Sequence, residues 1–152
     1  MQGLEKIVKE HSFFQGMSPG HIDFVSGCAS NARFRKGAFL FREGEDANAF
    51  YCIRTGRVAL ELHVPGRGAV QIDDRKAGDV LGWSWLVEPY RWYSDARAVE
   101  EVRALVFDCT CLRNKWQDDP ELGYQMYQRF APLMLRSLQA TRLQLVDMYG
   151  AD

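Results

Sequence analysis

The clearest indication of the fold class is the stretch FYCIRTGRVALELHV at residues 50–64. Apolar side chains alternate with other side chains over residues 58–64, which is the pattern of a half-buried β-strand. The sequence PGRG at residues 65–68 then predicts a hairpin turn into a second strand at residues 69–72. This part of the chain therefore predicts antiparallel β-structure.

Glycines recur through a longer segment, residues 32–108, which is rich in Phe, Val, Ile, Leu and Tyr. Each glycine is expected to supply the unusual dihedral angles of a turn between two strands. This spacing is typical of an antiparallel sandwich or barrel, in which each strand crosses the core once. The glycines lie seven to twelve residues apart and are Gly37, Gly44, Gly56, Gly66 and Gly78.

Helices are predicted before this segment, in residues 1–30. Ser18 and Pro19 form a cap and first-turn pair, and an apolar helical face follows them. Phe13 and Phe14 lie just before this helix and are expected to anchor the entry of the chain into the core.

A long helix is predicted near the C-terminal end, where Asp119 and Pro120 form a strong helix start. Apolar residues then recur at helical spacing until Gly150. Pro132 removes one backbone hydrogen bond and predicts a kink or a break at residues 128–131. A continuous helix of about 29 residues is roughly 43 Å long, which is longer than a β domain of this size covers. Part of its apolar stripe therefore needs another partner, and a second copy of the chain is the simplest one.

Length and charge bound the function. The chain has 152 residues with 19 basic and 20 acidic side chains, so its net charge is −1. This is the length of one domain, and we expect a single domain over residues 1–152. The absence of a basic excess argues against a dedicated nucleic-acid binder. No apolar run approaches the roughly 20 residues of a membrane span, and residues 1–10 lack a signal-peptide core. We therefore expect a cytoplasmic protein without membrane contact.

Side chains for metal or catalytic chemistry show no recognisable spacing. The cysteines are too few for a disulfide framework, and Cys109 and Cys111 would face one side of a strand without a second pair at zinc-ribbon spacing. The histidines form no metal-binding pair, and both the GxSxG motif and the P-loop are absent. We expect no catalytic residue, no metal and reduced thiols. The residues concerned are Cys28, Cys52, Cys109, Cys111, His11, His21 and His63.

The order of these elements resembles that of the cyclic nucleotide-binding domain superfamily, in particular the sensor domains of the catabolite-activator (Crp/Fnr) type. The resemblance extends over residues 12–148. The segments that carry it are FLFREGE at residues 39–45, FYCIRTGRV at 50–58, AGDVLG at 77–82, ARA at 96–98 and VRALV at 102–106.

The resemblance implies a mainly β fold with flanking helices, namely an antiparallel β-roll of the jelly-roll or double-stranded β-helix kind. Helices would occupy residues 1–30, the β-roll residues 32–108 and C-terminal helices residues 110–149. A phosphate-binding cassette would lie at residues 78–95. The resemblance also implies a bacterial protein of signal transduction rather than an enzyme.

In this family a helix N-terminus with a glycine binds the cyclic phosphate. An arginine neutralises the phosphate, and a glutamate accepts a hydrogen bond from the ribose hydroxyl. The long C-terminal helix caps the base and carries the dimer contact. If the resemblance holds, these are the contacts that a nucleotide would need in this chain.

The sequence departs from the family pattern at the charged positions. Trp83 stands where the glutamate would follow the cassette glycine Gly82, and Trp92 stands where the phosphate arginine would fall. The cassette is about one residue shorter, so a register shift would return a guanidinium to the phosphate through Arg91. Arg97 belongs to the outgoing strand and is expected to be a surface or structural residue.

Three tryptophans and two tyrosines fall within the cassette, and three interpretations remain open. The indoles fill the vacated pocket, because burial of a large apolar side chain gains about 1.5–3 kcal/mol. Alternatively they form a stacking site for a flat or cationic ligand, or an exposed docking surface for a protein. The candidate ligand-binding residues are Gly82, Trp83, Ser84, Trp85, Arg91, Trp92 and Ser94.

No helix-turn-helix segment is expected after the long helix, so we expect no direct DNA binding. The favoured interpretation is a stand-alone regulatory module with weak or lost affinity for cyclic nucleotides, no cofactor, and an unknown protein partner. The alternative is a sensor of cAMP, cGMP or another small molecule that uses the backbone from Gly82 to Trp85 together with Arg91. An enzyme of the cupin kind lacks the clustered metal ligands that it needs.

A homodimer is expected through the C-terminal helix, unless its stripe packs on the chain's own β-roll. Charged residues interrupt this face, which is why the second outcome stays open. The predicted dimer residues are Phe130, Met134, Leu138, Thr141 and Leu145.

Overall fold

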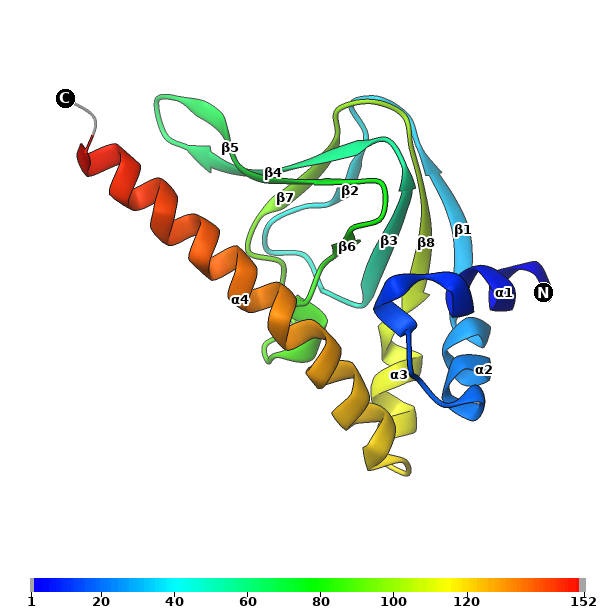
Figure 1. Ribbon diagram of the computed structural model, residues 1–152. Coiled ribbons are helices and arrows are strands. Elements are labelled where there is room, and N and C mark those ends of the chain that lie inside the picture. Colours follow the sequence, from blue (N-terminus) through cyan, green and yellow to red (C-terminus); the bar gives the residue numbers. More distant parts are fainter. Residues whose placement is uncertain (1, 151–152) are drawn as a thin grey trace.

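The computed structural model describes residues 2–150. Along the chain, helices precede and follow an antiparallel β-roll (Figure 1). The N-terminal elements are α1 (Gln2–Glu10), the short 3-10 helix η1 (Ser12–Phe14) and α2 (Pro19–Gly27). The strands are β1 (Ala29–Phe34), β2 (Phe39–Phe41), β3 (Ala49–Thr55), β4 (Arg57–Val64), β5 (Gly68–Lys76), β6 (Val80–Leu81), β7 (Asp95–Ala98) and β8 (Val102–Asp108). A 3-10 helix, η2 (Ser84–Leu86), interrupts them, and α3 (Cys109–Trp116) and α4 (Pro120–Gly150) follow.

The strands form two four-stranded sheets, in the orders β1-β8-β3-β6 and β2-β7-β4-β5. Every strand pair is antiparallel, which confirms the predicted β-roll. Helices α1, α2 and α3 gather at one end of the roll. Helix α4 starts beside them, crosses the roll and extends beyond it at the C-terminal end (Figure 1). The cassette thus lies between the roll and this helix.

The predicted turn glycines all have positive φ angles, which side chains other than glycine rarely adopt. Gly56, between β3 and β4, also needs to lack a side chain for reasons of space. A Cβ atom at this residue would overlap the carbonyl oxygen of Glu101. The spacing of the glycines therefore identified real strand ends.

The alternation predicted over residues 58–64 holds only in the second half of β4. Val58 and Leu60 face the core, but Ala59 and Glu61 on the other side are buried as well. Arg97 of the neighbouring β7 covers Glu61 with two hydrogen bonds of 2.9 Å. The buried carboxylate is thus satisfied by charge-assisted bonds, which the alternation pattern could not indicate.

The predicted N-terminal helix start is confirmed. The Ser18 hydroxyl accepts a hydrogen bond from the backbone N–H of His21, and Pro19 occupies the first turn of α2. Phe14 is buried, and Phe13 packs edge-on against the Phe130 ring of α4 at 4.9 Å between centroids. The segment before α2 therefore connects the N-terminal helices to the C-terminal one.

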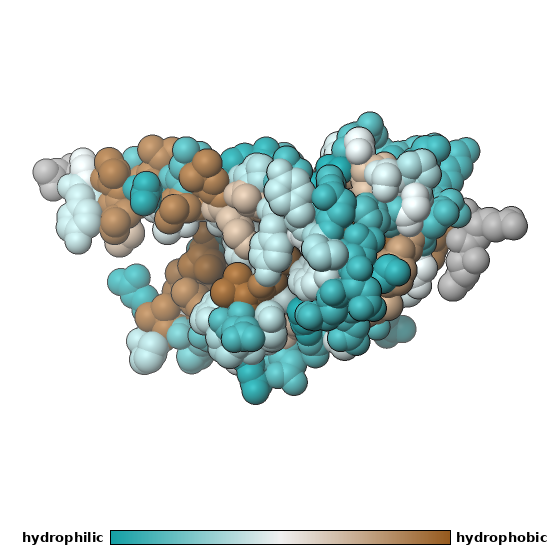
Figure 2. Space-filling model, turned by 90° about the horizontal axis from the view of Figure 1, so that it is seen from below, coloured by the Kyte–Doolittle hydropathy of each residue, from teal (hydrophilic) through white to brown (hydrophobic). Residues whose placement is uncertain are grey.

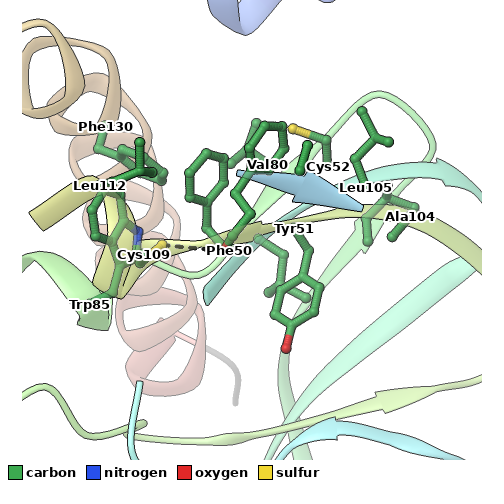
Figure 3. Close-up of a cluster of buried hydrophobic side chains, with 14 of the residues drawn as sticks. Phe50, Tyr51, Cys52, Val80, Trp85, Ala104, Leu105, Cys109, Leu112 and Phe130 are labelled. Atoms are coloured by element: carbon green, nitrogen blue, oxygen red, sulfur yellow. Dashed lines mark hydrogen bonds between the residues drawn. The ribbon is translucent and has the colours of Figure 1, made fainter. Parts of the chain in front are cut away.

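The core continues beyond the sheets into the space under α3 and α4 (Figure 3). Phe50 stacks on Phe107 with ring centroids 4.4 Å apart, and the Phe130 ring meets Phe50 edge-on at 5.2 Å. Leu112 of α3 closes the same cluster. The first half of α4 is consequently part of the core of the β-roll domain.

Helix α4 is unbroken from Pro120 to Gly150, so of the kink or break predicted near Pro132 the break does not occur. Pro132 lies on an exposed face of the helix. The carbonyl group that loses its partner there is that of the exposed Gln128, and the helix is held beside the proline by the core contacts of Phe130, Leu133 and Met134.

Cys109 and Cys111 lie in the first turn of α3, close to the predicted start of the C-terminal helices at residue 110, so the strand arrangement considered for the pair does not occur. The Asp108 carboxylate caps this helix by accepting hydrogen bonds from the N–H groups of Thr110 and Cys111 at 3.0 and 3.2 Å. Within residues 2–150, no cluster of His, Cys, Asp and Glu side chains suits a metal ion. In the same range, no helix combines the length and the apolar character that crossing a membrane requires.

Candidate ligand-binding cavity

A cavity of about 360 Å³ lies between the cassette, the β2-β7-β4-β5 sheet and α4. Of the candidate residues from the sequence, those that line it are Gly82, Trp83, Ser84, Trp92 and Ser94. Trp85 and Arg91 lie elsewhere. The cassette therefore forms a cavity wall, but with fewer of its predicted residues than expected.

Trp92 fills the part of the cavity next to the cassette glycine. Its ring stacks on Phe41 with centroids 3.7 Å apart and planes 7° apart, and only 5% of the residue is exposed. A Cβ atom at Gly82 would lie 2.8 Å from Cη2 of Trp92, so the indole occupies the space that this glycine leaves free. The interpretation that indoles fill the pocket describes Trp92 well.

Trp83 behaves differently, because its ring is half-buried and leaves the cavity open. The guanidinium of Arg75 lies over the Trp83 ring, 5.7 Å from its centroid. The stacking interpretation, in which an aromatic face remains accessible, therefore suits Trp83 better than Trp92.

Trp85 belongs to the hydrophobic core instead of the cavity. It is fully buried and stacks between Phe50 and Trp116, with 5.5 Å between the centroids in both cases. The 3-10 helix η2 turns this side chain away from the cavity and toward α3 and α4 (Figure 3). This correction removes one of the three cassette indoles from the candidate site.

Arg91 is held at the surface by the turn after β2. Its Nη1 atom lies 3.0 Å from Oδ1 of Asp46 and donates to the carbonyl oxygen of Gly44 at 3.2 Å. A short antiparallel bridge between Asp46 and Arg91 fixes the backbone of both residues. Arg91 is therefore engaged by Asp46 and Gly44 and is not among the residues that line the cavity.

Helix α4 closes the cavity with three polar side chains, Ser137, Thr141 and Gln144. Their spacing of four and three residues places them on one face of the helix. The Thr141 hydroxyl donates to the carbonyl oxygen of Ser137 at 2.9 Å. Thr141 was predicted at the dimer contact, whereas Ser137 and Gln144 were not predicted, because they lie outside the apolar stripe of the helix.

The charged side chains that line the cavity in the described chain are Asp73 and Arg75 of β5. Nη1 of Arg75 lies 2.7 Å from Oδ2 of Asp73 and also donates to the carbonyl oxygen of Asp74 at 2.8 Å. The Arg75 side chain is only 12% exposed. The one guanidinium at the cavity is thus already neutralised by an acidic neighbour.

A second, larger hollow of about 990 Å³ adjoins this cavity on the other side of Trp83. The two share Asp73, Arg75, Trp83 and Ser137. Arg75 and Trp83 therefore form the partition between them. Movement of either side chain would connect the two spaces.

Arg97 has the structural role that was expected of it. It binds both carboxylate oxygens of Glu61, and this pairing holds the pKa of the Glu61 carboxyl below its usual value, against the opposing effect of burial. Arg97 therefore ties β7 to β4 below the cavity and is not available to a ligand.

The predicted dimer residues fall into separate environments. Phe130 is fully buried in the chain's own core and is not available to a partner, and Met134 is half-buried. Leu138 and Leu145 are 47% and 52% exposed. Figure 2 shows brown, hydrophobic side chains gathered along the end of the molecule where the C-terminal half of α4 lies, across a hollow from a second hydrophobic area.

A β-roll whose lateral cavity is closed by a long C-terminal helix is the architecture of a ligand-sensing regulatory domain. Residues 32–119 match the family model "Cyclic nucleotide-binding domain", and the chain belongs to this family. Membership places it among regulatory sensor domains and not among enzymes.

The chain is similar to the CRP-like cAMP-activated global transcriptional regulator of Mycobacterium tuberculosis, with 26% identity over 149 residues. This match covers 98% of the chain but only 65% of that relative. In three dimensions it is similar to a cyclic nucleotide-binding domain from Methylobacillus flagellatus KT, with a TM-score of 0.78, 17% identity and coverage of 97% and 83% of the two chains. The catabolite activator protein of Thermus thermophilus gives a TM-score of 0.67 at 20% identity, covering 90% of this chain and 62% of that one.

Proposed function

We propose that this protein is a regulatory module whose affinity for cyclic nucleotides is weak or lost and whose output is contact with another protein. The observation that carries the proposal is the position of Trp92, which stacks on Phe41 and occupies the space beside Gly82. By the family resemblance, this is the residue that would be the phosphate-binding arginine.

The charge balance of the cavity supports the same proposal. A cyclic phosphate carries a negative charge, and its removal from water is unfavourable unless a cation or several N–H donors replace the water. Arg75 is bound to Asp73, and Arg91 is bound to Asp46. A phosphate would have to break one of these ion pairs before it gained a guanidinium.

Isothermal titration of the protein with cAMP and with cGMP tests the proposal. We expect no heat of binding at micromolar ligand, and the intrinsic fluorescence of the cassette tryptophans should stay constant. Micromolar binding by the wild-type protein would contradict the loss of affinity.

A double variant, Trp83→Glu with Trp92→Arg, is the positive control for this titration. It returns both charged side chains that the family uses, and we expect cAMP to raise its melting temperature while leaving that of the wild type unchanged. Circular dichroism of the unliganded variant verifies that it folds. A folded variant that shows no response to cAMP would mean that the two tryptophans are not the reason for the loss.

The exposed apolar side chains of α4 support a homodimer as the form that contacts partners. Beyond residue 137 every described residue of α4 is exposed, and the large apolar ones include Leu138, Leu143, Leu145, Val146 and Met148. Light scattering should give twice the monomer mass of 17.4 kDa. A monomer at high protein concentration would contradict the dimer and leave the ligand question untouched.

One observation favours a second candidate function, a sensor of a small molecule. The cavity stays open beside Trp83, and polar side chains from the cassette and from α4 converge on it. In the form considered from the sequence, Arg91 would leave Asp46 and bind the phosphate of a cyclic nucleotide. Arg91→Ala should then abolish a shift in melting temperature that the wild type shows with that nucleotide. Absence of any shift in the wild type removes this candidate.

A further inference from the structure

Two of the four cysteines, Cys28 and Cys111, meet where the N-terminal helices join the end of the β-roll. Cys28 caps α2 and precedes β1, and its carbonyl oxygen accepts a hydrogen bond from the N–H of Asp108 at 2.9 Å. The carboxylate of the same Asp108 accepts from the N–H of Cys111 at 3.2 Å. Pairing of Ala29 with Phe107 in the sheet fixes this arrangement. The two cysteines are 83 positions apart in sequence, yet each is one hydrogen bond from Asp108.

The two thiols also contact each other and differ in their surroundings. Cys111 is exposed and lies in the first turn of α3, where a dissolved oxidant can reach its sulfur. Cys28 is half-buried, and burial together with its hydrogen bond to Cys111 raises the pKa of the Cys28 thiol to about 12. Cys28 therefore remains protonated at neutral pH. An accessible thiol beside a protonated, sheltered one is the arrangement of an attacking and a resolving cysteine.

The remaining cysteines differ from this pair. Cys52 and Cys109 are buried, and the Cys109 thiol donates to the carbonyl oxygen of Phe107 at 3.5 Å. Burial raises the pKa of the Cys52 thiol to about 12. Neither sulfur is accessible to a dissolved oxidant, so these residues serve as internal controls.

We propose that Cys28 and Cys111 form an intramolecular disulfide when the protein meets a hydroperoxide. In the first step the Cys111 thiolate attacks one peroxide oxygen, an S–O bond forms, the O–O bond breaks, and the leaving hydroxide takes up a proton to become water. In the second step the Cys28 sulfur attacks the sulfenic sulfur, the S–S bond forms, the S–O bond breaks, and a second water leaves with the Cys28 proton. The two cysteines together lose the two electrons that the peroxide gains.

The disulfide would add a covalent link at a place that already holds two parts of the chain together. His21 of α2 lies 2.9 Å from Asp119, which precedes α4, and Lys115 of α3 lies over the Phe24 ring of α2 at 5.4 Å. Oxidation would therefore join the end of α2 covalently to α3, the helix that directly precedes α4. Through this link the oxidation state of the pair would affect the helix that closes the cavity and carries the exposed apolar face.

The test treats the full chain with hydrogen peroxide under native conditions and counts free thiols by maleimide labelling and intact mass. We expect two thiols to be lost, a mass decrease of about 2 Da for the two hydrogens, and a peptide in which residues 28 and 111 are linked. Dithiothreitol should reverse all three changes. The oxidised protein should melt at a higher temperature than the reduced protein.

Three variants make the assignment specific. Cys111→Ser should retain all its thiols after treatment, because the attacking sulfur is gone. Cys28→Ser should instead accumulate a sulfenic acid at Cys111 that dimedone labels, and Cys52→Ser should respond as the wild type does. Retention of four thiols in the treated wild type would overturn the proposal, and so would a link that involves Cys109 or a second chain.

Discussion

The two halves of α4 both carry apolar residues at helical spacing, but these residues lie in opposite environments. In the first half, Leu122, Met126 and Phe130 are fully buried against the β-roll and α3. In the second half, polar residues line the cavity, and the apolar residues Leu138 and Leu145 are 47% and 52% exposed. Apolar spacing alone therefore identifies the helix but not the surface that covers it.

The comparison also shows where the stability of each half originates. An isolated helix of about 12–15 residues is marginal in water, so a helix of this length depends on packing of its apolar face. The first half obtains this packing from its own domain. The second half needs it from outside, which is the physical argument for a partner.

The largest expected effect comes from replacing one large apolar side chain by alanine in each half of α4. Phe130→Ala removes a ring that packs against Phe13, Phe50 and Trp85, and should lower the free energy of unfolding by about 3–5 kcal/mol. Leu138→Ala in the second half should change the stability of the monomer very little. Urea unfolding at low protein concentration measures both, and equal losses would show that the second half is packed as well.

The next effect concerns association. Leu138→Glu places a charge in the exposed apolar face and should weaken the dimer at least 100-fold, or about 2.7 kcal/mol. Gln139→Glu adds the same charge one residue away and is the matched control. Sedimentation over a concentration series compares them, and equal weakening by both variants would indicate a general charge effect instead of a loss of apolar contact.

A smaller loss of stability is expected when one hydrogen bond between the first half of α4 and the cassette is removed. The Tyr127 hydroxyl donates to the carbonyl oxygen of Leu86 at 2.6 Å. Tyr127→Phe should lower the free energy of unfolding by about 1 kcal/mol. Tyr124→Phe, at a neighbouring exposed tyrosine on the same helix, should have almost no effect in the same thermal or urea melts.

The smallest effect depends on pH and concerns the start of α4. A hydrogen bond from His21 holds the pKa of the Asp119 carboxyl below its usual value. A lowered pKa in the folded state means that this carboxylate contributes stability above its unfolded pKa, near 3.9, and loses the contribution as the pH falls through the folded value. Asp119→Asn should therefore flatten the loss of stability between pH about 5 and 2.

Asp118→Asn changes the charge at the preceding residue and is the control for that measurement. Urea midpoints across the acid range should retain the wild-type slope in Asp118→Asn and lose part of it in Asp119→Asn. Identical slopes in all three proteins would mean that the carboxylate does not stabilise the docked half of the helix.

Much of the fold followed from the sequence because local rules and packing agree there. The glycines at strand ends need positive φ angles, and Ser18 and Asp119 lie at helix starts where their side chains accept N–H hydrogen bonds. The errors arose where tertiary contacts decide. Glu61 is buried because Arg97 reaches it from another strand.

The cavity was less predictable for the same reason. The cassette positions of Trp83 and Trp92 followed from counting along the chain, but the direction of Trp85 depends on the turn of η2. Arg75 was missed because it lies on β5 and reaches the cavity only through the fold. A cavity built from three separate segments cannot be assembled from spacing within one of them.

The contact between Gly82 and Trp92 has an evolutionary consequence. The backbone requires glycine at residue 82 because its φ angle is +98°, and the missing side chain leaves space that the indole of Trp92 enters. A tryptophan at position 92 therefore needs no earlier change at position 82, and its loss would leave that glycine acceptable. The space for a large aromatic side chain at position 92 is thus provided by the backbone requirement for glycine at residue 82.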